Sequence, residues 1–236
     1  MTIAVDAGVL ARAWLSVYHA SGKDQKIPAL CRTMHVEEYP HGVRLIAADG
    51  FMLLAVWVPE AQDVLAAEPG WDEIPYASAT VIDRHGRAAS LMGYLASVTG
   101  GDDGEKLEVR LTLNVPWQPD GVSGADLQID GFEALAATVE VPDRERLQLE
   151  VYEGSWVRWQ KVLGDVPAVG SVEGVVLAPD LAVRLGRAAK AVDAPELRLR
   201  FGGPLLPVSV VLPGWETVYG AVMPRRDTAV DGSVVA

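Results

Sequence analysis

The sequence has few of the residues that most often carry chemistry or anchor a chain in a membrane. It contains one cysteine, Cys31, four histidines and no long uninterrupted apolar run. A single cysteine excludes an internal disulfide, so cysteine usage does not point to an oxidising compartment. No stretch approaches the roughly 18 apolar residues of a membrane span. The first ten residues lack the basic segment of a signal peptide. We therefore expect a cytoplasmic protein that does not enter a membrane.

Positive charge is also scarce. The chain has 20 Lys and Arg against 32 Asp and Glu over 236 residues, a formal net charge of -12. Such a surface repels polyanions unless its cations gather in one place, so nucleic-acid binding over the whole surface is excluded. The hydrophobic content of 50% is enough for a sizeable core, and the length allows one large domain or two unequal ones.

What the chain does contain is a repeated order of predicted elements. The first unit has a strand over 2–5, a helix over 7–21 and strands over 33–39, 43–48 and 51–58. The second has a strand over 78–82, a helix over 84–99 and strands near 105–113, 125–130 and 134–141. The third has a strand over 173–177, a helix from an N-cap at Asp180 to Val192 and strands over 196–201, 207–212 and 217–223. This order predicts an α+β fold made of three β-α-β-β-β units.

The three predicted helices share one charge pattern. Ranges 7–23, 84–99 and 181–192 together hold seven Lys or Arg and no Asp or Glu. At the chain's average composition about six acids would be expected there. An ordinary solvated face explains one such helix. For three helices we interpret the pattern as a phosphate-facing surface, made of Arg12, Lys23, Arg84, Arg87, Arg184, Arg187 and Lys190.

Three segments resemble the bacterial DNA polymerase sliding clamps. "AADGFMLLAVWVP" (47–59) resembles the clamp stretch Ala-Thr-Asp-Gly-His-Arg-Leu-Ala. "EGSWVRWQKVLG" (153–164) resembles the segment Asp-Gly-Arg-Phe-Pro-Asp-Tyr-Arg-Arg-Val-Leu-Pro that closes a clamp domain, and "VYGAVMPRR" (218–226) resembles the C-terminal Tyr-Val-Val-Met-Pro-Met-Arg-Leu. The chain departs from the family at Phe51 and Met52, which replace His-Arg, and at Val157 and Arg158, which replace Pro-Asp.

The resemblance implies the DNA clamp fold, in which paired units form a domain, helices line a ring and sheets lie outside. It implies a complete clamp domain over 1–165, half of another over 166–226 and a flexible tail over 227–236. Family rings contain twelve units, supplied as two subunits of six or three of four. Because this chain has three units, we expect a homo-oligomer of four subunits, with a head-to-tail trimer or a dimer as alternatives.

The resemblance also implies a function. A clamp is a processivity factor for DNA replication that encircles double-stranded DNA without reading its sequence, and it has neither catalytic activity nor a cofactor. DNA polymerase and clamp loader would bind by short linear motifs in an apolar cleft. The matching cleft residues are Gly50, Phe51, Met52, Leu53, Lys161, Val162, Val222, Met223, Pro224 and Arg225. The alternative for Leu53, Val162 and Met223 is a place in the core.

Two other functions stay open. His35, Glu37, Glu38 and His41 flank a hairpin and could place nitrogen and oxygen ligands near a metal ion, although their spacing matches no recognised site. The loss of half a domain would also suit a clamp-like adaptor or decoy that does not encircle DNA. Retention on circular DNA together with stimulation of polymerase would distinguish a clamp from both.

Overall fold

The computed structural model describes most of the first and third predicted units and parts of the second. The described residues are 2–22, 32–63, 66–70, 73–82, 95, 107–113, 137–140, 147–149, 151–152, 156, 159–160, 175–203, 206–213 and 218–224. No helix within these ranges is long and apolar enough to cross a membrane.

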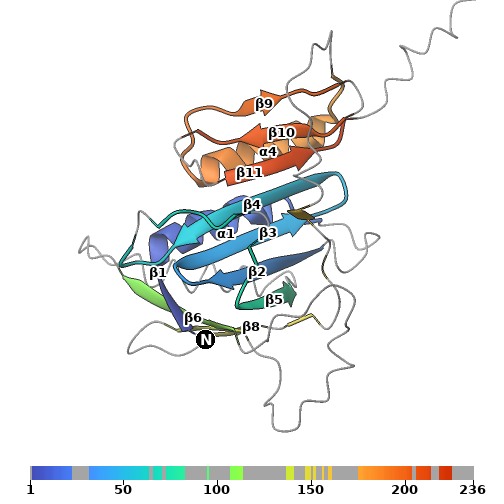
Figure 1. Cartoon of the computed structure of the whole chain (residues 1–236). Helices are drawn as coiled ribbons and strands as arrows, with labels where there is room; N and C mark the ends of the chain where they lie inside the picture. Colours follow the sequence, from blue (N-terminus) through green and yellow to red (C-terminus); the bar gives the residue numbers. More distant parts are fainter. Residues whose placement is uncertain are drawn as a thin grey trace, which may run out of the picture.

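Two antiparallel sheets form the framework (Figure 1). The four-stranded sheet has the order β1 (Thr2–Asp6), β6 (Glu108–Leu113), β7 (Ala137–Glu140) and β8 (Leu147–Leu149). The seven-stranded sheet has the order β5 (Ala77–Ile82), β2 (Thr33–Tyr39), β3 (Gly42–Ala48), β4 (Met52–Pro59), β11 (Val218–Val222), β10 (Val208–Val211) and β9 (Arg198–Arg200). Together with the helices, these sheets confirm the predicted α+β clamp fold.

The first two units exchange their first strands. Strand β1 leads into helix α1 (Ala7–Tyr18) of the first unit but pairs with β6 of the second. Strand β5 begins the second unit but pairs with β2 of the first. Asp6 ends β1 and caps α1, because its carboxylate accepts a hydrogen bond of 2.8 Å from the Val9 amide. The exchange makes each sheet depend on both units.

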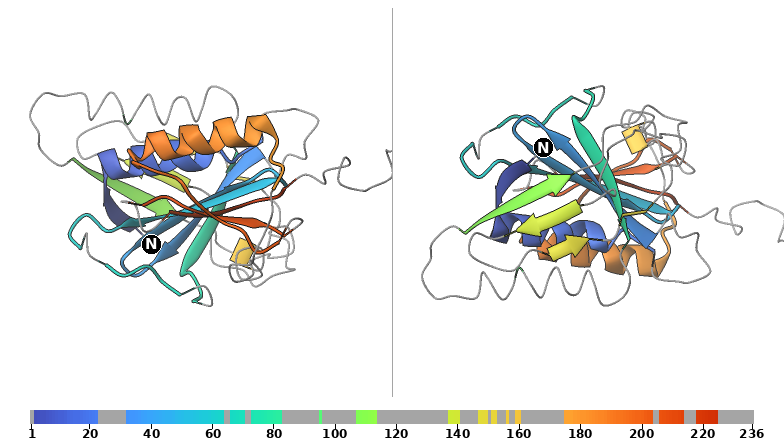
Figure 2. Two further views of the ribbon diagram at one scale, coloured as in Figure 1. Left: turned by 90° about the horizontal axis from the view of Figure 1, so that it is seen from above. Right: turned by 90° about the horizontal axis from the view of Figure 1, so that it is seen from below.

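The third unit joins the first through both of its layers. Strand β11 pairs with β4, with Leu53 opposite Ala221, so the sheet continues from one unit into the next. Helix α4 (Pro179–Ala191) lies beside α1 on the same face of the sheets (Figure 2). The buried Ser16 hydroxyl of α1 donates a hydrogen bond of 3.1 Å to the Ala188 carbonyl of α4. The main core fills the space between this helical layer and the sheets.

The structure corrects three of the predicted elements. A strand was predicted over 173–177, but its described residues 175–177 form no strand apart from an isolated bridge at Val176. The N-cap of α4 is Ala178, not Asp180, because Pro179 with its fixed φ starts the helix and puts Asp180 in the first turn. Strand β8 was not predicted, since three residues are too few for a clear alternating pattern. The predicted helix over 84–99 lies outside the described residues apart from Leu95, which is helical and buried. The predicted strand over 125–130 also lies outside them.

Candidate DNA-facing and partner-binding surfaces

Exposed cations lie on the helical layer. Arg187 and Lys190 are both exposed on α4, on the face turned away from the buried Leu185 and Ala188. On α1, the Arg12 side chain is 47% exposed and lies 3.8 Å from the carboxylate of Asp193. These three residues are therefore open to solvent, which a phosphate-facing surface requires. Three other members of the predicted set lie outside the described residues: Lys23, Arg84 and Arg87.

Arg184 differs from the other cations of α4 because its guanidinium is used inside the molecule. The side chain is only 14% exposed, and its Nη1 atom lies 2.5 Å from Oδ2 of Asp49. Its Nε donates to the carbonyl of His19 over 2.8 Å, and Nη2 donates to that of Ser21 over 3.3 Å. Arg184 thus fastens α4 to the end of α1 and to the β3–β4 turn. We therefore remove it from the predicted DNA-facing set.

The β3–β4 turn is built on Asp49. One carboxylate oxygen accepts hydrogen bonds from the amides of Phe51 (2.9 Å) and Met52 (2.8 Å), and the other oxygen meets Arg184. Gly50 has a φ of 88°, in the left-handed region where a glycine is preferred. The turn therefore places the Phe51 side chain at the surface, where it is 63% exposed.

Two of the three predicted cleft segments meet at the junction of β4 and β11. Met52 lies opposite Val222 in the strand pair, and the Met223 amide donates to the Phe51 carbonyl over 2.8 Å. Met223 is 38% exposed and Pro224 is partly exposed. We call Phe51, Met223 and Pro224 the junction patch. It is an apolar surface made by segments far apart in the sequence.

Several predicted cleft residues are buried instead. Met52 and Val222 belong to the main core below the helices. Leu53 belongs to a smaller cluster on the other face of the sheet, together with Ile46 and Trp159. Leu53 is therefore a core residue, which was the alternative to a place in the cleft, whereas Met223 is exposed. Outside the described residues lie Lys161, Val162 and Arg225.

The sequence reasoning missed Trp156 and Trp159 as residues next to the junction. Trp159 is buried in the cluster with Leu53, and Trp156 packs against that cluster. Both stand in the 153–164 segment that resembles the domain-closing clamp segment. Two tryptophans within four residues of a connecting stretch indicate a buried anchor, and that pattern could have identified them. Both tryptophans lie on the outer face of the sheet, beside β3 and β4.

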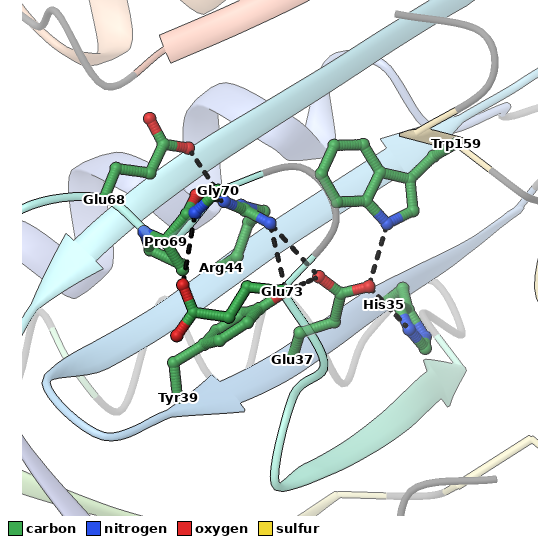
Figure 3. Close-up of polar contacts among 9 residues, drawn as sticks. All are labelled: His35, Glu37, Tyr39, Arg44, Glu68, Pro69, Gly70, Glu73 and Trp159. Carbon is green, nitrogen blue, oxygen red and sulfur yellow. Dashed lines mark hydrogen bonds and ion pairs between the residues drawn. The ribbon is translucent and has the colours of Figure 1, made fainter. Parts of the chain in front are cut away.

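A buried polar network lies on the same outer face (Figure 3). The Arg44 guanidinium is 1% exposed and donates to the hydroxyl of Tyr39 (3.0 Å) and to the carbonyl of Pro69 (2.6 Å). It also lies 3.3 Å from the Glu68 carboxylate and stacks over the ring of Trp159 at 5.0 Å. Arg44 thereby holds the segment around Pro69 and the indole of Trp159 onto β3.

Glu37 forms the other half of this network. It accepts hydrogen bonds from the indole of Trp159 (2.8 Å) and the hydroxyl of Tyr39 (2.9 Å). His35 lies 3.6 Å from the same carboxylate and binds the Thr80 hydroxyl at 2.9 Å. Burial alone would raise the pKa of Glu37, but its interactions with His35, Trp159 and Tyr39 hold it below the usual value of 4.5.

Of the four residues considered as metal ligands, only His35 and Glu37 belong to this network. Side chains alternate along a strand, so Glu38 points to the sheet face opposite Glu37. His41 is exposed in the hairpin turn, away from both. Within the described ranges, no group of three or more His, Cys, Asp or Glu side chains is placed to hold a metal ion. His35 and Glu37 therefore serve packing between β2 and the segments that cover it.

Comparison with known proteins connects this arrangement to one fold. No family model and no curated protein sequence matches the chain. Among solved structures, the DNA polymerase sliding clamp of Pseudomonas aeruginosa matches with a TM-score of 0.60 at 11% identity, over 96% of this chain and 67% of the clamp. The polymerase III beta subunit of Caulobacter crescentus matches with a TM-score of 0.55 at 14% identity, over 95% and 65%. That of Thermotoga maritima matches with a TM-score of 0.51 at 10% identity, over 94% and 64%.

The chain therefore has the fold of the bacterial DNA polymerase sliding clamps in a shortened form. It spans about two thirds of the length of the clamp subunits it matches, as the 64% to 67% coverage shows. At identities of 10% to 14%, the likeness identifies the fold, whereas activity depends on the surfaces that this chain presents.

Proposed function

We propose that this protein is a DNA sliding clamp that encircles double-stranded DNA as an oligomeric ring and tethers DNA polymerase. The observation that carries the proposal is the paired helical layer of a clamp fold with exposed Arg187 and Lys190 on α4 and exposed Arg12 on α1. Loose, partly water-mediated phosphate contacts suit a ring that slides, because base contacts would hold it at one sequence. The net charge of the whole chain is -12, so the surface away from these cations is acidic and discourages DNA from binding outside the ring.

The ring would be made of four copies. We divide the chain into a complete clamp domain over 1–165, half of another over 166–226 and a tail over 227–236. Two copies joined through their third units would make a three-domain half ring. Because β4 of the first unit is already paired with β11 of the third, two such halves would close the ring through their second units, with dihedral symmetry. A trimer or a dimer of this three-unit chain would give a ring with fewer than twelve units.

Charge reversal on α4 tests the DNA-facing surface. Arg187→Glu should lower retention on nicked circular DNA and reduce its salt dependence, since each phosphate contact adds to the release of counterions. Arg110→Glu is the matched control, because Arg110 is exposed on β6 between the core residues Val109 and Leu111 and so points away from the helices. Equal retention by the two variants would contradict the proposed lining.

The junction patch is the proposed polymerase-binding site. It presents Phe51 and Met223, and flexible methionine and aromatic side chains suit a surface that accepts several apolar peptides. Clamp loader and polymerase would share it through short linear motifs. If the chain binds a polymerase through this patch but is not retained on circular DNA, it is the non-encircling adaptor instead.

A further inference from the structure

Within the described residues, the third unit has no strand exchange of the kind that completes the first two. Units one and two each give their first strand to the other's sheet. Strand β9 is the last strand of its sheet, and no described strand pairs with its outer edge. Residues 175–178, directly before α4, form no strand of either sheet, although Val176 takes part in an isolated β-bridge and is 42% exposed.

The two completed exchanges follow one register. In both, the last residue of a first strand lies opposite the first residue of the partner unit's second strand: Asp6 with Glu108, and Ile82 with Thr33. One position inward, the opposed side chains are apolar and at most 3% exposed: Val5 with Val109, and Val81 with Met34. The apolar pair at this position therefore closes the core between two units.

The third unit carries both halves of the same pattern. Ala178 precedes α4 in an extended conformation, as Asp6 precedes α1, so it corresponds to the last residue of a first strand. Strand β9 begins at Arg198. The register of the other units then places Leu177 opposite Leu199. Both leucines touch the main core, but each is only partly buried in the single chain.

We propose that the third unit of a second copy completes this one, with residues 175–178 of each copy paired to β9 of the other. The partner is another copy because the chain itself carries a segment of the required kind, which runs directly into a helix and has a leucine at the closing position. The exchange is symmetric, so one surface supplies both halves of an isologous interface. It also sets Arg198 and Arg200 opposite uncharged residues of the partner subunit, which avoids opposed like charges.

This inference deepens the proposed ring by naming the surface that joins two copies, but the exchange itself depends only on the fold. Its test is a cross-link between copies in a Cys31→Ser background. Leu177→Cys and Leu199→Cys are made as separate variants, mixed and mildly oxidised. Opposed residues of antiparallel strands lie within disulfide reach, so the mixture should give a covalent dimer that neither variant gives alone. As a control, Leu206→Cys, at an exposed position of the third unit, should give no covalent dimer with Leu177→Cys.

A second measurement uses uncrosslinked protein. Leu199→Lys should raise the dimer Kd at least about 10-fold, because the interface loses two buried leucines, whereas Leu206→Lys should leave it unchanged. Light scattering over a concentration series measures both, and circular dichroism confirms that the variants fold. Absence of the mixed cross-link, or an internal disulfide in the Leu177→Cys/Leu199→Cys double variant, would overturn the exchange. A cross-linked dimer that fails to stay on circular DNA would instead contradict only the proposed clamp function.

Discussion

Replacing Arg184 should destabilise the protein far more than replacing its neighbours on the same helix. The guanidinium donates three hydrogen bonds, to the Asp49 carboxylate and to the carbonyls of His19 and Ser21. The Asp49 side chain is 4% exposed, so an alanine at position 184 would leave a buried carboxylate without its positively charged partner. Removing one member of a buried ion pair costs about 3 to 5 kcal/mol. We expect Arg184→Ala to cost about 3 kcal/mol, since 14% of the arginine side chain remains open to water.

Urea unfolding followed by circular dichroism measures this cost. Arg187→Ala is the matched control, because Arg187 is exposed on the same helix and its loss should change the unfolding free energy by less than about 0.5 kcal/mol. Asp49→Asn combined with Arg184→Ala should recover part of the loss, since the unpaired charge is then gone. If Arg184→Ala unfolds within about 0.5 kcal/mol of wild type, Arg184 is not a structural residue and returns to the DNA-facing set.

The remaining predictions concern the sheet, the buried network and the patch. Gly220→Val should detach the third unit, seen as early proteolysis after residue 165, because a Cβ there would lie 2.7 Å from the Leu53 carbonyl oxygen. Glu37→Gln should cost about 1 to 3 kcal/mol at pH 7. Because the pKa of Glu37 is lowered in the folded protein, Glu37 stabilises the fold only while its carboxylate is ionised. The cost of Glu37→Gln should therefore shrink as the pH falls below 4.5, which urea unfolding at several pH values measures. Phe51→Glu should abolish stimulation of polymerase on long primed templates, whereas Ile74→Glu, at a site 60% exposed, should not.

The order of the elements could be predicted from the sequence because local patterns set it. Strands β2, β3 and β4 lie within one residue of their predicted ranges, since apolar runs and the Asp49-Gly50 turn mark their ends. Which strands pair could not be predicted from these patterns, because the exchange of β1 and β5 depends on contacts between units.

The roles of individual charged residues were harder to predict than their positions. Helical spacing put Arg184, Arg187 and Lys190 near one another, but only the fold brings Asp49 against the first of them. Charged residues within strands, such as Glu37 and Arg44, would ordinarily face water, yet both are buried under segments that arrive from elsewhere in the chain. The resemblance supplied the two segments of the junction patch, and in the structure Phe51 and Met223 lie together at the surface. That they bind a partner stays a prediction.

The most direct test of the clamp account is whether the protein is held on DNA by topology. Protein is incubated with nicked circular plasmid, the complex is isolated by gel filtration at a salt concentration that removes nonspecific binding, and half of it is cut once with a restriction enzyme. A ring should stay on the uncut circle and leave the cut DNA, because a sliding ring runs off a free end. Equal retention on both forms, or none on either, would contradict the claim that this protein encircles DNA.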